Sequence, residues 1–117
     1  PRPDLLLRHG NSGQRAMAYV FAPDNADPAT GEGERASVAR FFFPKHGAVI
    51  EDPGTGSACA NLGGWLIATG AALPQRIAIA QGEAVGRPCR LGLEVTAEGR
   101  IRVSGRVVEL ARGVVTL

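Results

Sequence analysis

The sequence predicts an α+β fold in which a mostly antiparallel sheet curls around one central, buried helix. Two observations carry this prediction. Several short segments rich in β-branched and aromatic residues are separated by turn residues, and one segment, 57–69, has the length and composition of a helix. The chain has 117 residues, of which 44% are hydrophobic. This length fits a single domain, residues 1–117, with a core of its own.

The first two expected strands enclose a polar loop. Residues 16–22 form one apolar run and residues 37–43 form another, in which Arg40 alternates with apolar neighbours. The segment between them, 23–35, is crowded with Pro, Asp, Asn, Gly and Glu, a composition typical of a loop. We therefore expect a hairpin here.

Further short strands are expected after the helix. Glu98-Gly99 marks a turn. Arg100, Arg102 and Ser104 alternate with apolar residues, which indicates a strand with one solvent-exposed face. The expected strands of this region are residues 76–81, 91–96, 100–104, 107–110 and 114–117.

The helix segment, residues 57–69, contains no charged residue. A helix that is apolar all round is normally buried all round, so the sheet should wrap it on most sides. Gly63 and Gly64 each cost about 1 kcal/mol relative to Ala in a helix interior. Such a cost is tolerable where neighbouring strands approach the helix backbone closely. Gly70 is expected to end the helix.

The residues that begin this helix form the predicted site. A helix N-terminus leaves its first N–H groups unpaired and carries a partial positive charge, so it attracts anions. Gly54 and Gly56 leave these groups open to a ligand, while Thr55 and Ser57 can cap the helix or donate to a bound carboxylate. The plainer alternative is that Asp52, Thr55 or Ser57 is only an N-cap in a glycine turn. Because the helix should be buried, we favour a carboxylate site that faces a cleft.

Composition points away from several other kinds of site. The 13 basic residues are scattered from Arg2 to Arg112 and the net charge is +2, which gives no sign of a nucleic-acid surface. No apolar run approaches the roughly 20 residues that span a bilayer, so we expect no membrane contact and a cytoplasmic protein. Cys59 and Cys89 have no ligand-spaced partners, so neither a metal site nor a disulfide framework is expected. We expect Cys59 to be a small, buried hydrophobic residue.

Two segments of the chain resemble the phenazine-biosynthesis isomerase (PhzF-like) family. The first comprises Arg40-Phe41-Phe42-Phe43-Pro44, then Gly47 and Glu51-Asp52-Pro53-Gly54-Thr55-Gly56-Ser57-Ala58. The second, Gln81-Gly82-Glu83-Ala84-Val85-Gly86-Arg87-Pro88, is similar to a family segment with Gln-Gly followed by Gly-Arg-Pro. The resemblance runs from about Tyr19 to the C-terminus. It implies one half, the C-terminal one, of a two-domain protein with the diaminopimelate-epimerase-like fold.

The resemblance also implies roles for particular residues. Asp52 resembles the family's ligand-contacting acid and is the catalytic candidate. The segment Gly54, Thr55, Gly56 and Ser57 matches the carboxylate-binding helix start. The family's proton-transferring Glu and a His near the ligand lie in the N-terminal half and have no counterpart here. Thiol-dependent relatives carry Cys where this chain has Pro53, so racemisation by two thiols is not expected.

The resulting expectation is an isomerase or epimerase that moves a proton on a small carboxylate or amino-acid-like substrate. The base would come from an absent N-terminal half, and no cofactor would be needed. The expected partners are the carboxylate ligand, that N-terminal half and, as an open option, a second copy in a homodimer. The chain alone should be inactive. Two alternatives stay open, a non-catalytic carboxylate-binding module and an inactive domain fragment.

Overall fold

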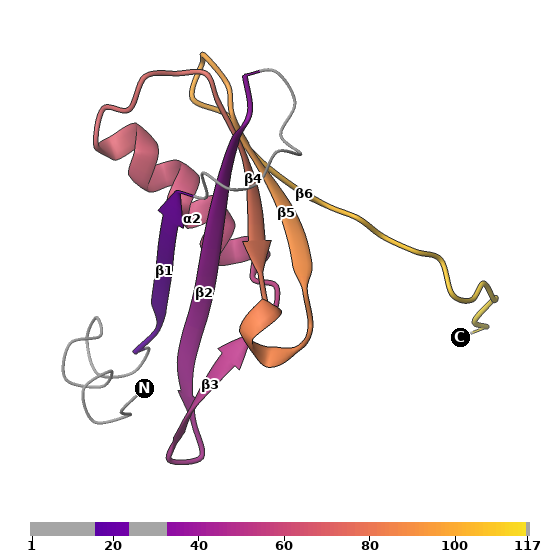
Figure 1. Ribbon diagram of the computed structural model, residues 1–117. Coiled ribbons are helices and arrows are strands. Elements are labelled where there is room, and N and C mark those ends of the chain that lie inside the picture. Colours follow the sequence, from indigo (N-terminus) through magenta and orange to yellow (C-terminus); the bar gives the residue numbers. More distant parts are fainter. Residues whose placement is uncertain (1–15, 24–32, 117) are drawn as a thin grey trace.

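A computed structural model describes residues 16–23 and 33–116, which form a mixed six-stranded sheet with one α-helix on one of its faces (Figure 1). The α+β class is therefore confirmed. The elements in chain order are β1 (Ala18–Pro23), β2 (Arg35–Lys45), β3 (Ala48–Asp52), α2 (Gly56–Ala68), β4 (Gln75–Gln81), the short 3₁₀ helix η1 (Glu83–Val85), β5 (Cys89–Val95) and β6 (Ile101–Gly105).

The long strand β2 organises the sheet. One of its edges pairs with β1 in antiparallel register. On the other edge its first half pairs with β4 in parallel register, and its second half pairs with β3 in antiparallel register. The ends of β3 and β4 therefore meet beside the middle of β2, where Asp52 lies opposite Phe41 and Gln81 lies opposite Ala39. Strands β5 and β6 continue the sheet beyond β4 with antiparallel pairing.

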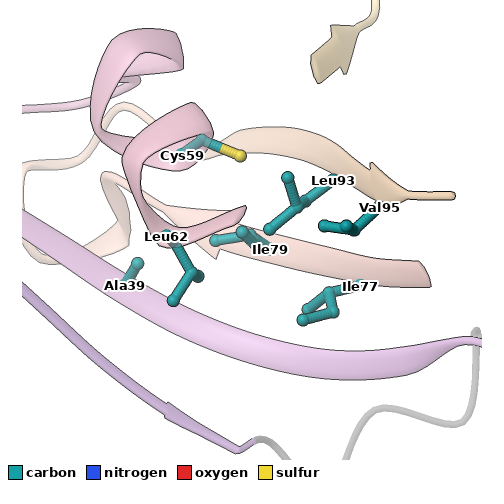
Figure 2. Packing of buried hydrophobic residues seen from close by; sticks show 7 residues of the cluster. All are labelled: Ala39, Cys59, Leu62, Ile77, Ile79, Leu93 and Val95. Carbon is teal, nitrogen blue, oxygen red and sulfur yellow. The ribbon is translucent and has the colours of Figure 1, made fainter. Parts of the chain in front are cut away.

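The core lies between α2 and the face of the sheet beneath it (Figure 2). The helix packs mainly against β5 and β6. A Cβ atom added at Gly63 would lie 2.9 Å from Cγ2 of Ile101, so the expected close approach to a strand is found at this glycine. Gly64 has nothing within 4 Å of such an atom. The buried cluster comprises Ala39, Cys59, Leu62, Ile77, Ile79, Leu93 and Val95.

The expectation that the helix is buried on all sides is wrong for the described chain. The buried positions of α2 are Ala58, Cys59, Leu62 and Gly63, which follow one face of the helix. Trp65 on another face is 52% exposed. The physical reason is that the sheet lies along one side of α2 and does not wrap it, so uncharged residues on the other side face outward within the described residues.

The observed strands differ from the expected ones in three places. Strand β3 was missed, because the run that forms it is short and ends in two acidic residues. The segments expected as strands at 107–110 and 114–117 are not strands over their described positions, and Leu117 lies outside the described residues. Instead the tail runs away from the sheet, with Leu110 92% exposed (Figure 1). These residues find no neighbouring strand to pair with among the described residues.

The predicted hairpin is confirmed by the pairing of β1 with β2, although residues 24–32 of its loop lie outside the described residues. No helix in the described part of the chain is long and apolar enough to cross a membrane.

Candidate functional site

The two acidic residues that end β3 lie on opposite faces of the sheet, because successive side chains of a strand alternate. Glu51 pairs with Arg40 through two hydrogen bonds, of 3.0 Å from Nε and 2.6 Å from an Nη nitrogen. The Arg40 guanidinium also lies over the Phe42 ring, 5.0 Å from its centroid. The hydrogen bonds from Arg40 hold the pKa of Glu51 below its usual range. The Glu51 carboxylate therefore serves a structural ion pair.

Asp52 instead belongs to the face that carries α2. Its Oδ2 atom accepts a hydrogen bond of 2.5 Å from the hydroxyl of Thr55. Thr55 occupies the N-cap position of α2, yet within the described part of the chain its side chain makes no capping hydrogen bond. The first turn of α2 also contains no acidic residue. Instead of capping the helix, the Thr55 hydroxyl is turned toward Asp52.

Gln81 joins this group and was not among the residues predicted for the site. It ends β4 and its side chain is buried, with 1% exposed. Its Nε2 donates to the Asp52 carbonyl oxygen at 2.8 Å and to Thr55 Oγ1 at 3.0 Å. Its Oε1 accepts from the Thr55 backbone N–H at 3.4 Å. A signal was present in the sequence, since Gln81-Gly82 opens the second segment of the family resemblance.

Two glycines let the backbone segments around the site approach each other. A Cβ atom at Gly54 would lie 2.8 Å from the Cys89 sulfur. Gly82 has a φ of +86°, and a Cβ atom there would lie 2.6 Å from the Pro53 carbonyl oxygen and also collide with the Arg87 carbonyl oxygen. The Asp52–Thr55 turn is thus held directly against the turn that follows β4.

The open side of the site is the start of α2. Thr55 is buried, Gly56 is half-buried, and Gly54 and Ser57 are exposed. The N–H groups of the first helical turn have no partner within a helix, so these positions present donors to an anion. All five predicted residues therefore lie at the junction of β3 and α2: Asp52 ends the strand, Gly54 and Thr55 follow it, and Gly56 and Ser57 begin the helix.

No metal centre is evident among the described residues, and the Cys59 thiol is not placed to react. No group of three or more His, Cys, Asp or Glu side chains is placed to hold a metal within the part of the chain described. Cys59 is fully buried, as expected, and burial raises its thiol pKa to about 11. A thiol with so high a pKa is protonated at neutral pH and is a poor nucleophile.

Comparisons with known proteins agree with the resemblance seen in the sequence. The profile of a family described as phenazine biosynthesis-like protein matches residues 8–113. A protein of Pasteurella multocida (strain Pm70), described as an uncharacterized isomerase, is 46% identical over 82 residues. The match covers 70% of this chain but only 28% of that relative, so the shared segment is little more than a quarter of the relative's length. No solved structure matches the chain.

Proposed function

The chain belongs to the phenazine biosynthesis-like protein family, and on this premise we propose that it supplies one side of the active site of an isomerase. The substrate class is a small carboxylate or an amino-acid-like molecule. The segment that this chain shares with its relative is only 28% of that relative. The activity of the whole protein is therefore part of this proposal.

One observation carries the proposal: the N-cap hydroxyl of α2 is committed to Asp52 and leaves the helix start uncapped. The N–H groups of Gly56 and Ser57, with the Ser57 hydroxyl, would bind the substrate carboxylate. Backbone donors at a helix N-terminus favour a negative charge through their geometry and through the helix dipole. A second contact comes from Asp52.

Asp52 would hold a donor group of the same substrate. Thr55 occupies Oδ2, and Oδ1 would accept from an amine or hydroxyl of the ligand. Two anions so close together repel each other unless a donor or a cation lies between them. The pairing of Asp52 with a carboxylate-binding helix start therefore favours a substrate that carries both a carboxylate and a hydrogen-bond donor, as an amino acid or a hydroxy acid does.

The proton-transferring group would come from elsewhere in the protein. Glu51 is tied to Arg40 on the opposite face of the sheet, and Asp52 is engaged by Thr55. In the proposed reaction a base of the N-terminal half removes a proton from a carbon next to an activating group, and the proton returns at another position or on the other face. The chain described would bind and orient the substrate for this step.

Solvent deuterium incorporation tests the proposal. The chain, joined or mixed with the N-terminal half of its parent protein, is incubated in D₂O with a panel of small amino and hydroxy carboxylates. We expect exchange at a carbon-bound position of at least one of them, and none with the chain alone. Binding without exchange would favour the non-catalytic binding module. Exchange by the chain alone would contradict the assignment of the base to another half.

A further inference from the structure

We propose that Gln81 is a positioning residue of this site: its side-chain amide sets the direction of the hydrogen-bond chain to Asp52 and keeps Thr55 from capping α2. The ligand-binding part of this inference rests on the proposed function, whereas its structural part does not.

The orientation of the Gln81 amide follows from its partners. The Asp52 carbonyl oxygen can only accept hydrogen bonds, so the NH₂ end of the amide must face it, at 2.8 Å. The same NH₂ group donates to Thr55 Oγ1 at 3.0 Å, and the amide oxygen faces the Thr55 N–H at 3.4 Å. The side chain is buried, so water does not compete for these contacts. Both polar ends of the Gln81 side-chain amide are thus committed to the Asp52–Thr55 turn.

This orientation fixes the direction of the next hydrogen bond. A hydroxyl group has one hydrogen, and Thr55 Oγ1 already accepts from Gln81. Its own hydrogen is therefore free to point to Asp52 Oδ2, 2.5 Å away, and this oxygen must accept. The direction of donation runs from Gln81 through Thr55 to Asp52.

The same series of hydrogen bonds explains why the N–H groups at the start of α2 are free of a side-chain cap. A threonine at an N-cap normally accepts from the N–H of the second or third helical residue, here Ser57 or Ala58. Thr55 makes no such bond because its oxygen is held between Gln81 and Asp52. Gln81 therefore controls both features of the site, the accepting carboxylate and the free helix donors.

Replacement of Gln81 by Glu tests this directly, because the two side chains have nearly the same shape. An ionised Glu has no donor, so the Thr55 hydroxyl would turn to it and leave Asp52. The probe is glycolate, which carries both the carboxylate and the hydroxyl donor that the proposed site requires, and its binding to the chain is followed by amide shifts of Gly56 and Ser57 in ¹⁵N–¹H spectra. Because Asp52 is no longer held by Thr55 in this variant, we expect Q81E to weaken glycolate binding about tenfold near neutral pH, as for a lost charge-assisted hydrogen bond. Binding should recover relative to the native chain at acidic pH, where a protonated Glu donates again.

Two controls separate positioning from a general loss of structure. Gln75, at the other end of β4, donates only to the Ala72 carbonyl oxygen among the described contacts, so Q75E should leave glycolate binding unchanged. Replacement of Thr55 by Val breaks the same series of hydrogen bonds, so it should weaken binding as Q81E does. Adding Q81E to the Thr55→Val variant should weaken binding little further. Thr55→Ser should keep native binding. Binding by Q81E or Thr55→Val within twofold of the native value, or additive losses, would overturn the proposal.

Hydrogen exchange provides a test that needs no ligand. In Gln81→Leu the Thr55 oxygen is released, and we expect it to cap α2 and slow exchange of the Ser57 or Ala58 amide by about fivefold or more. Unchanged exchange in a folded variant would overturn the inference about Gln81. If the native chain does not bind glycolate while this slowing is seen, the proposed carboxylate site fails and the positioning role of Gln81 stands.

Discussion

Thr55 donates its hydroxyl hydrogen to Asp52 across 2.5 Å, at the junction where β3 gives way to α2. An N-cap threonine that points back to a carboxylate, instead of forward to its own helix, leaves the helix donors uncommitted. The Thr55–Asp52 hydrogen bond therefore links the turn after β3 to the proposed carboxylate site at the start of α2.

Replacement of Asp52 by Asn should impair the function of the site, whereas replacement of Glu51 by Gln should impair stability. Asp52 faces the start of α2, but Glu51 forms its ion pair with Arg40 on the other face. In the complete protein we expect D52N to lower kcat/KM at least tenfold for the best substrate of the deuterium-exchange panel. E51Q should keep kcat/KM near the native value and lower the thermal midpoint. If E51Q lowered kcat/KM while D52N lowered only the thermal midpoint, Glu51 and not Asp52 would be the carboxylate of the site.

Gly82 and Gly86 form a matched pair for the turn that supports the site. Both have positive φ, 86° and 69°, but only Gly82 is crowded by backbone atoms of Pro53 and Arg87. Gly86→Ala should cost about 1 kcal/mol, the usual penalty of a left-handed conformation. Gly82→Ala should cost clearly more, since backbone must move, and denaturant unfolding measures both. Equal costs would mean that the Pro53 contact does not hold the turn.

Gly63 and Gly64 make a second matched pair, in the middle of α2. A methyl group at Gly63 would press on Ile101 and Leu93, at 2.9 and 3.2 Å, whereas one at Gly64 meets nothing within 4 Å. Gly64→Ala should therefore stabilise the chain by about 0.5–1 kcal/mol through helix propensity. Gly63→Ala should destabilise it, because overpacking of a core typically costs about 1–3 kcal/mol. Thermal unfolding of both variants checks the packing of α2 on β5 and β6.

Tyr19 is the only tyrosine in the chain, so its ionisation can be followed by ultraviolet absorbance. Its hydroxyl is buried and has no hydrogen-bond partner among the described residues, and burial raises its pKa from 10.0 to about 12, with a smaller contribution from nearby Cys59. The folded state thus holds this proton more tightly than the unfolded state does. The stability due to this difference is fully present below pH 10 and is lost as the pH rises toward 12.

The Tyr19→Phe variant should lose less stability over this alkaline range. Because an unpaired buried hydroxyl is unfavourable, the variant should also be as stable as the native chain or more stable by about 1 kcal/mol at neutral pH. A native phenol that titrates near 10 would contradict the burial of the Tyr19 hydroxyl.

The helix and the first hairpin could be predicted from the sequence. The helix was expected at 57–69 and lies at Gly56–Ala68, and the site segment directly before it was identified from its glycines and hydroxyls. Such features depend on neighbouring residues, whose capping, turn and propensity rules are local. The carboxylate-binding roles of Asp52 and of residues 54–57 remain predictions.

Features that depend on long-range pairing could not be predicted. The role of Gln81 requires Asp52 to lie opposite Phe41 while Gln81 lies opposite Ala39, and this register combines one antiparallel and one parallel pairing of β2. Burial of α2 was overestimated for a related reason. The absence of charge shows that the helix is apolar, but not on how many sides the sheet covers it. Trp65, which is 52% exposed, lies on a side that the sheet does not cover.

The central claim is that the start of α2 binds a carboxylate beside Asp52, and a titration of the chain with glycolate tests it most directly. Glycolamide, which has the same hydroxyl group but no charge, is the matched control. We predict that glycolate shifts the amide signals of Gly56 and Ser57 in a saturable manner, that glycolamide does not, and that replacement of Gly56 by Ala weakens the effect. That variant should fold, since its added methyl group approaches Val103 no closer than 3.9 Å. Equal shifts with both compounds, or shifts confined to residues away from α2, would contradict the claim.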